Sequence, residues 1–316
     1  MKALLLEKGE LMLKDMPPPL PLKEEVLLKV LKAGICSTDL EMVKGYMDFE
    51  GVPGHEFVGQ VVEAPEKNWE GKRVVGEINI ACGKCELCLE GREKHCPSRD
   101  VLGIYKKNGT FAEYLTLPLK NLHFLPYTIC NKEAVFVEPL AASLEVMEQT
   151  KIGQDDSVLV LGDGKLGLLA AQVMKMRTDH VCCLGKHKRK LEILKKRKIK
   201  TFLKGQEIGK KFDIVVEATG DKEGLKEALF LVEPRGKVIL KSTYHEQANI
   251  DTSKIVVDEI QLIGSRCGPF PKAISILKRK LVEVMEMVDG DFPLGKAIEA
   301  FELAQKPGTM KVLITP

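Results

Sequence analysis

The sequence lacks a long hydrophobic run, a marked excess of charge of either sign and any internal repeat. Its apolar stretches all fall short of the roughly 20 residues that a membrane-spanning helix requires, so we expect no membrane partner. The 48 basic and 45 acidic residues give a net charge of +3, which is too small to draw the chain to nucleic acid. Glu7, Lys8 and Glu10 interrupt the N-terminal stretch, which therefore has no secretory signal, and we expect a cytoplasmic location.

The pattern of short elements changes along the 316 residues, a length that suits two domains. Residues 1–140 are β-rich, with strands expected at 25–32, 56–63 and 73–78 between Gly, Pro and charged turns. Residues 141–268 alternate strands and helices, which predicts an α/β domain with a doubly wound parallel sheet. The expected strands there are 158–161, 181–184, 212–218, 237–241 and 261–265. Residues 269–316 are too few for a separate domain and are expected to return to the first one.

A glycine-rich turn follows the first strand of the second region, in the stretch VLVLGDGKLG. The first glycine permits the turn, the second lets the backbone approach a pyrophosphate, and the third lets the next helix pack close to the strand. The start of that helix then offers free N–H groups to phosphate. The turn predicts a dinucleotide site formed by Gly162, Asp163, Gly164, Lys165, Leu166 and Gly167.

Four cysteines fall within fifteen residues in the pattern C-x2-C-x2-C-x7-C, as Cys82, Cys85, Cys88 and Cys96. Four thiolates close a tetrahedral shell around zinc and leave no open position, so this pattern predicts a structural zinc site. An iron–sulfur cluster and a zinc knuckle that binds nucleic acid are the alternatives. The residues between the cysteines mix acidic and basic side chains without aromatic ones, which disfavours the knuckle.

A second set of candidate metal ligands consists of Cys36, His55, Glu56 and Glu138. A catalytic zinc takes three protein ligands and leaves one position open, and Cys36, His55 and one carboxylate meet that need. Taken singly, each has a simpler explanation, since a lone Cys is usually buried core and a lone His a satisfied polar residue. Their occurrence beside a dinucleotide turn favours the metal site.

The stretches GICSTD, GHEFVG, the four-cysteine pattern, VEPLAAS and LGDGKLG occur in this order, and together the chain resembles the zinc-containing medium-chain alcohol dehydrogenase family. The resemblance implies a GroES-like catalytic domain followed by a Rossmann domain, two zinc ions per chain and a homodimer or homotetramer. Glu138 stands where much of that family has a second Cys, as in its polyol, sugar and threonine dehydrogenase branch. In that branch Glu56 is an alternative ligand, so the resting ligand is Glu56 or Glu138.

The resemblance also implies hydride transfer between a secondary alcohol or polyol and NAD(P). Thr38 then receives the proton of the substrate hydroxyl, and Asp39 holds the ring of His55. An ordinary helix N-cap explains Ser-Thr-Asp equally well, and both roles can hold together.

The residue that follows the second strand of the Rossmann region is Gly185, where an NAD site usually has an Asp or Glu for the ribose 2′-hydroxyl. No carboxylate is expected to repel a 2′-phosphate, and a basic run follows, so NADP is favoured over NAD. A solvated basic helix face is the other explanation of that run. The further cofactor contacts we predict are Gly185, Lys186, His187, Arg189, Thr219 and Arg266.

Two other functions compete with this interpretation. A zinc-independent quinone or enoyl reductase of the same superfamily lacks the cysteine lobe and usually the Cys and His pair. A regulatory or interaction protein that holds zinc and a dinucleotide without turnover does not need Thr38 or the complete ligand set.

Overall fold

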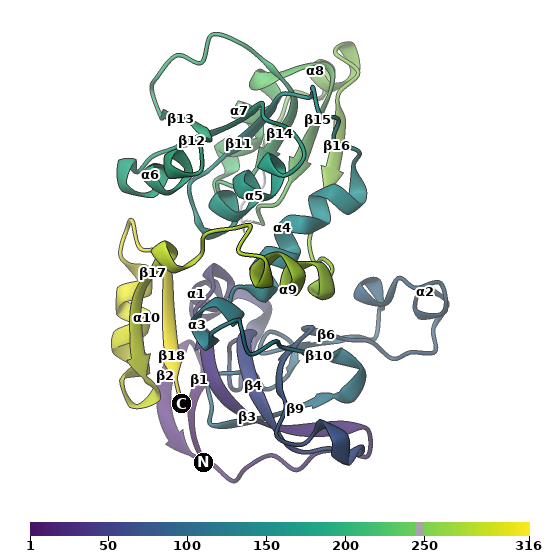
Figure 1. Cartoon of the computed structure of the whole chain (residues 1–316), viewed down its shortest axis with the longest axis vertical. Coiled ribbons are helices and arrows are strands. Elements are labelled where there is room, and N and C mark those ends of the chain that lie inside the picture. The colour runs from purple at the N-terminus through teal and green to yellow at the C-terminus, as the bar shows by residue number, and fades with distance from the viewer. Residues whose placement is uncertain (244–248) are drawn as a thin grey trace. The chain divides into compact units, whose positions relative to one another are not determined.

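The computed structural model describes residues 1–243 and 249–316, and these residues divide into two compact units (Figure 1). Unit 1 contains Met1–Glu138, Ile274–Leu281 and Val288–Pro316. Unit 2 contains Pro139–Ala273 and Val282–Met287. The C-terminal segment thus divides between the units instead of returning to the first as a whole.

Unit 1 is built around a seven-stranded sheet with the order β10-β5-β4-β3-β18-β17, in which β9 also pairs with β3. The last strand, β18, runs antiparallel to β3 and places Leu313 opposite Gly34, so the C-terminal chain completes the sheet that the N-terminal region begins. Figure 1 shows this as the yellow strands beside the purple ones. A two-stranded sheet (β1-β2) and a three-stranded sheet (β6-β7-β8) complete the unit.

The elements of unit 1 are short, as the sequence predicts for a β-rich region. Its strands are β1 (Lys2–Glu7), β2 (Glu10–Asp15), β3 (Glu25–Gly34), β4 (Glu56–Glu63), β5 (Arg73–Gly76), β6 (Asn79–Ile80), β7 (Asp100–Leu102), β8 (Lys106–Lys107), β9 (Tyr114–Pro118), β10 (Leu122–Phe124), β17 (Val288–Pro293) and β18 (Lys311–Thr315). Its helices are α1 (Ser37–Val43), α2 (Glu86–Leu89), α3 (Asn131–Ala134) and α10 (Ala297–Gln305).

Unit 2 contains a six-stranded parallel sheet with the order β13-β12-β11-β14-β15-β16. This is the 3-2-1-4-5-6 order of a Rossmann fold, whose ligands bind where the order reverses, at the carboxyl ends of the strands. All four residues of β11 are buried, which fits a central strand covered on both faces. Its strands are β11 (Val158–Leu161), β12 (Val181–Gly185), β13 (Lys200–Leu203), β14 (Phe212–Glu217), β15 (Val232–Leu240) and β16 (Gln261–Gly264).

The helices of unit 2 alternate with these strands: α5 (Lys165–Lys175), α6 (Lys188–Lys196), α7 (Lys222–Leu231) and α8 (Thr252–Val257). Two more helices, α4 (Val137–Gln149) and α9 (Phe270–Lys278), run across the limits between the units. The sequence predicts five strands here and misses β13, a partly exposed edge strand of four residues. No helix within residues 1–243 and 249–316 combines the length and apolar character needed to cross a bilayer.

Candidate metal centres and dinucleotide site

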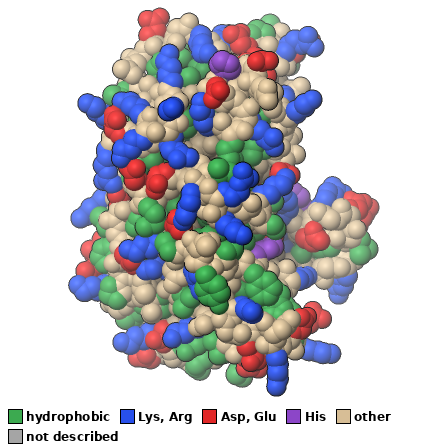
Figure 2. All heavy atoms as spheres, in the orientation of Figure 1, with side chains coloured by type: hydrophobic (Ala, Val, Ile, Leu, Met, Phe, Trp, Pro, Cys, Tyr) green, Lys and Arg blue, Asp and Glu red, His purple; other side chains and the backbone are tan. Residues whose placement is uncertain are grey.

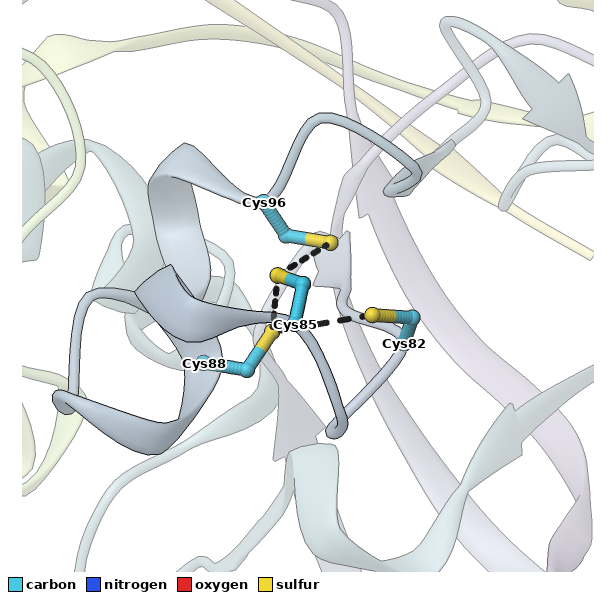
Figure 3. Close-up of side chains that lie close together, drawn as sticks. All are labelled: Cys82, Cys85, Cys88 and Cys96. Atoms are coloured by element: carbon cyan, nitrogen blue, oxygen red, sulfur yellow. Dashed lines mark hydrogen bonds between the residues drawn. The ribbon is translucent and has the colours of Figure 1, made fainter.

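Four cysteine side chains converge in the loop between β6 and β7 of unit 1 (Figure 3). The Sγ atoms lie 3.4 Å apart for Cys85 and Cys88, 3.8 Å for Cys85 and Cys96, and 3.9 Å for Cys82 and Cys88. A disulfide has an S–S distance of about 2.05 Å, so all four are free thiols. A tetrahedral zinc ion with Zn–S bonds of about 2.3 Å places its sulfur ligands about 3.8 Å apart. The four thiols therefore fit a closed zinc site.

Two of these thiols, Cys82 and Cys88, differ strongly in acidity. Backbone N–H groups of Lys84 and Cys85 lower the pKa of Cys82 to about 6. Burial, together with the contact to the Cys85 thiol, raises the pKa of Cys88 to about 12. Thiols this close cannot all ionise unless a cation balances them, because each thiolate disfavours the next. A divalent metal supplies that charge, so the donor chemistry also fits zinc.

A second group in unit 1 joins Cys36, His55 and Glu56, whose ligand atoms all lie within 4.8 Å of one another. The pairing of β3 with β4 creates it. The antiparallel register places Gly34, at the end of β3, opposite Glu56, at the start of β4. Cys36 follows Gly34 by two residues and His55 directly precedes Glu56, so residues nineteen apart in sequence meet at one point. Thiolate, imidazole and carboxylate are the ligand types that zinc takes in proteins.

Asp39 lies in the first turn of α1 and is completely buried. Its Oδ2 accepts the backbone N–H of Cys36 at 2.7 Å, so the carboxylate caps the helix. Its Oδ1 lies 3.4 Å from Nδ1 of His55, within ion-pair range but without hydrogen-bond geometry. Because Nδ1 faces Asp39, Nε2 is the ring nitrogen left for a metal, an arrangement common at zinc sites.

The ionisation of His55 reflects the same neighbours. Burial lowers its pKa, but the negative charge of Asp39 and the contacts with Asp39 and Cys36 outweigh this effect. The pKa of His55 therefore lies well above its ordinary value. A metal that binds this ring has to displace a proton from it.

Thr38 is partly exposed, and its Oγ1 lies 3.8 Å from Sγ of Cys36. The hydroxyl therefore adjoins the group of metal-ligand atoms. The cap on α1 comes from Asp39, so the Thr38 hydroxyl is not required for that purpose.

Glu56 is also the partner of a buried lysine that the sequence analysis did not single out. Lys311, the first residue of β18, is fully buried and its Nζ donates to Oε2 of Glu56. A Cβ atom on Gly34 would lie 2.8 Å from that oxygen and 2.5 Å from Cγ1 of Val135, so only glycine leaves room for the pair. The available signal was a lysine at the start of an otherwise apolar strand, KVLIT.

Glu138 lies in the first turn of α4, and its carboxylate is not part of the group formed by Cys36, His55 and Glu56 among the described residues. The structure thus brings three of the four predicted ligands together. The part of Glu138 in a metal site stays a prediction.

The glycine-rich turn of unit 2 has the geometry that its sequence predicts. Gly162 adopts a φ of 110°, and a Cβ atom there would lie 2.4 Å from the carbonyl oxygen of Ala218. A Cβ on Gly167 would lie 2.1 Å from the carbonyl oxygen of Gly162, so α5 packs directly on the turn. Gly164 has open space where its Cβ would be, which leaves the backbone accessible to a phosphate.

A pocket of about 240 Å³ lies at the carboxyl ends of β11, β12 and β14. Of the predicted contacts, Gly162, Asp163, Gly164, Gly185, Lys186, His187 and Thr219 line it. Lys165 and Leu166 form the first turn of α5 next to it, whereas Arg189 and Arg266 are exposed and are not among its lining residues. Lys190, from the basic run, also lines it, and sequence reasoning missed Lys204, Asp221, Glu223 and Glu227.

Thr219 is held in this pocket by a buried carboxylate. Both its backbone N–H and its hydroxyl donate to Oε1 of Glu217, at 2.8 and 2.6 Å. Ser242 donates to the same oxygen at 3.0 Å. These bonds fix the turn that follows β14, at the edge where a Rossmann fold binds its ligand.

These features define a class of protein: a β-rich unit with two groups of residues of the types that bind zinc, joined to a Rossmann unit. Comparison with known families agrees. Residues 22–127 match the family described as the alcohol dehydrogenase GroES-like domain, and residues 131–315 match the glucose dehydrogenase C-terminus.

Among curated proteins, the chain is 29% identical to sorbitol dehydrogenase of Halalkalibacterium halodurans, over 98% of this chain and 96% of that protein. It is 30% identical to the starvation-sensing protein RspB of Escherichia coli, over 100% of this chain and 99% of that one.

Two crystal structures share the fold. An RspB structure from Escherichia coli in complex with NADH superposes with a TM-score of 0.93 and 28% identity, covering 100% of this chain and 99% of that one. A zinc-binding dehydrogenase from Sinorhizobium meliloti bound to NADP gives a TM-score of 0.90 and 27% identity, with the same coverage. The chain belongs to the zinc-containing medium-chain alcohol dehydrogenase family. Its activity is that of a dehydrogenase, and a regulatory protein without turnover is not supported.

Proposed function

We propose that this chain transfers a hydride between a secondary alcohol or polyol and a nicotinamide dinucleotide, with zinc at Cys36 and His55. The observation that carries the proposal is the convergence of Cys36, His55 and Glu56 in a chain that also folds a glycine-rich dinucleotide turn. Relatives named sorbitol, D-arabitol-phosphate and erythritol/L-threitol dehydrogenase support a polyhydroxylated substrate.

Two zinc ions per chain form part of the proposal. Cys36, His55 and a carboxylate would hold the first, where zinc acts as a Lewis acid that makes a substrate hydroxyl more acidic. The second would be structural and held by the lobe Cys82, Cys85, Cys88 and Cys96.

The carboxylate ligand of the first zinc is Glu56 or Glu138. Glu56 stands with Cys36 and His55, but Lys311 competes with a metal for its carboxylate. Zinc content separates the two assignments. Of the variants Glu56→Gln and Glu138→Gln, the one that removes the true ligand should lower the zinc occupancy of that site. The other variant should keep both zinc ions.

The remaining roles fall to neighbouring side chains. Thr38 receives the proton that leaves the substrate hydroxyl, which its partial exposure beside Cys36 allows. Asp39 keeps Nδ1 of His55 engaged, so that the ring presents Nε2 to the metal. A conservative Asp39→Asn change should therefore weaken zinc binding at this site about 10- to 100-fold.

The dinucleotide is held through backbone groups in this proposal. α5 begins at Lys165, directly after the open space at Gly164, and the N-terminus of a helix suits a pyrophosphate. The nicotinamide ring then accepts or donates the hydride. The preference for NADP over NAD that the sequence indicates rests on the missing acid at Gly185, a residue against which the side chain of Asp163 lies.

Metal analysis and a substrate screen test the proposal together. We expect two zinc ions per chain and NAD- or NADP-linked oxidation of one or more polyols, sugars, secondary alcohols or threonine. Cys36→Ser should abolish turnover and leave the fold intact, since Cys36 lies outside the four-cysteine lobe. Full activity in Cys36→Ser, or no turnover by the zinc-loaded protein across the whole panel, would contradict the proposal.

A homodimer or homotetramer and a cytoplasmic location complete the proposal. Both come from the family resemblance and the N-terminal sequence. Light scattering on the purified protein and fractionation of the source cells test them.

A further inference from the structure

In the dinucleotide pocket, the side chain of Asp163 lies where a side chain on residue 185 would lie. A Cβ atom built on Gly185 would lie 2.5 Å from Cβ of Asp163, 2.6 Å from its Oδ2 and 2.7 Å from its Cγ. The side chain of Asp163 therefore fills the space that a side chain at residue 185 would enter. Glycine at residue 185 is what allows an aspartate at residue 163.

The two residues meet because of the parallel sheet. β11 and β12 pair in register, with Leu161 beside Leu184, and the backbone N–H of Gly162 donates to the Leu184 carbonyl at 2.9 Å. Asp163 lies in the glycine-rich turn, two residues after β11 ends, and Gly185 is the last residue of β12. The carboxylate thus reaches the end of the second strand from the turn after the first.

The chain fixes the position of this carboxylate firmly. Asp163 is 6% exposed and lines the pocket, and its Oδ2 accepts the backbone N–H of His187 at 2.5 Å. Nδ1 of His187 lies 3.1 Å from the same oxygen and 3.2 Å from Oδ1. The carboxylate consequently faces the end of β12 in one defined orientation.

In Rossmann domains that bind NAD, an Asp or Glu at the end of the second strand accepts hydrogen bonds from the adenosine ribose. The expectation that no carboxylate faces this position is wrong, because Asp163 reaches it from the turn after β11. Resting on the proposed function, we propose that Asp163 is the ribose-binding carboxylate of this dehydrogenase, supplied by the glycine-rich turn, and that the chain selects NAD(H) over NADP(H).

The other charges of the pocket do not offset Asp163. Lys186 faces Asp221 at 3.7 Å, and the ring of His187 is engaged by Asp163 itself. The lining contains the lysines 186, 190 and 204 and the carboxylates 163, 221, 223 and 227, which is one more negative than positive charge. A 2′-phosphate brings up to two further negative charges beside a buried carboxylate, whereas a 2′-hydroxyl can donate to it.

Direct binding measures this selection without turnover. The zinc-loaded protein is titrated with NADH and with NADPH, and bound nicotinamide is followed by its own fluorescence. We expect the wild-type protein to bind NADH at least tenfold more tightly than it binds NADPH. Asp163→Ala should weaken NADH by about 10- to 100-fold, the range of a lost hydrogen bond to a charged group. Asp163→Asn keeps the size of the side chain and should tighten NADPH.

An exchange of the two residues provides the matched control. Gly185→Asp alone forces the new Cβ against the Asp163 side chain and should weaken both dinucleotides. In the double variant Asp163→Gly/Gly185→Asp the carboxylate returns to the end of β12. Glycine is needed at residue 163, since the Cβ of an alanine would stay 2.5 Å from the new Cβ. The double variant should recover the NADH preference that Asp163→Gly lacks.

The outcomes separate this inference from the proposed function. Equal or tighter binding of NADPH by wild type overturns the inference, and so does an unchanged NADH-to-NADPH ratio in Asp163→Ala. Failure of the folded wild type to bind either dinucleotide overturns the proposed function and the inference together. Rescue by the double variant supports both.

Discussion

The buried pair of Glu56 and Lys311 makes the energetics of unit 1 testable. Lys311→Met keeps much of the side-chain volume but removes the cation from Glu56, whose side chain is 2% exposed. Apart from that carboxylate, the hydrogen bonds described for the Lys311 ammonium comprise only a 3.5 Å contact to the Ile35 carbonyl. Loss of one partner from a buried ion pair lowers the free energy of unfolding by about 3–5 kcal/mol. In a domain of this size that corresponds to a fall in Tm of about 6–20 °C.

Trp69 makes the assay specific for unit 1. It is the only tryptophan of the chain, lies in unit 1 and stacks on Phe124 with ring centroids 4.0 Å apart. Its fluorescence during urea or thermal denaturation therefore reports the unfolding of that unit. The reference protein and the Lys311→Met variant both carry Cys36→Ser, so that a metal ion at Cys36 and His55 does not compensate the charge of Glu56.

A second variant separates an unpaired charge from lost packing. Glu56→Gln in addition to Lys311→Met removes the stranded carboxylate, and the double change should restore more than half of the lost stability. A loss below about 1 kcal/mol in Lys311→Met, or a double variant no more stable than the single one, would refute the reasoning, because either result means that the carboxylate is solvated or neutral.

Three further changes test other contacts. Gly167→Ala places a Cβ 2.1 Å from the Gly162 carbonyl oxygen, so we expect at least tenfold weaker dinucleotide binding by fluorescence titration, and unchanged binding would show that the turn is not used. Cys85→Ser should lower the zinc content by one ion per chain, because it opens the tetrahedral shell. It should also lower the Tm of unit 1, and this loss of stability should be larger than any change in substrate affinity. Burial raises the pKa of Asp291, but its contacts with Lys32, Lys132 and Thr315 outweigh this and leave the pKa lowered. Asp291→Asn should therefore destabilise unit 1 by about 1 kcal/mol at pH 7, and the difference from wild type should shrink in urea melts as the pH falls below the ordinary Asp pKa of 3.8 and vanish once the pH is below the lowered pKa of folded Asp291.

The parts of the fold that the sequence predicts best are those with a strong local signal. The apolar strand β11 and its glycines occur where the pattern places them, because Gly162 and Gly167 each leave room for a close backbone contact and Gly164 leaves open space. The basic run around α6 hides β13, since that edge strand has no alternating apolar face. In the same way β17, VDGDFP, gives no strand pattern and forms because β18 offers it a parallel partner.

The candidate metal ligands are predictable from motifs, whereas the residues that pair with them are not. Cys36, His55 and Glu56 lie in recognisable stretches, and the register of β3 and β4 brings them together. Lys311 lies 255 residues from Glu56 in sequence and belongs to a strand that completes the sheet last. Nothing local to either residue indicates the pair, because its cause is the return of the C-terminal chain.

The dinucleotide pocket shows why position in a motif is weaker evidence than position in space. The usual reasoning assigns the ribose carboxylate to the residue that ends the second strand, and Gly185 then indicates NADP. The requirement of the chemistry, however, is a carboxylate at a point in the pocket, whichever strand supplies it. In a parallel sheet the ends of β11 and β12 are neighbours, so a residue just beyond either one can reach that point. A glycine after the second strand is therefore informative only together with the residue after the first glycine of the turn. Here that residue is Asp163, and the absence of an acid at Gly185 is the condition for its presence.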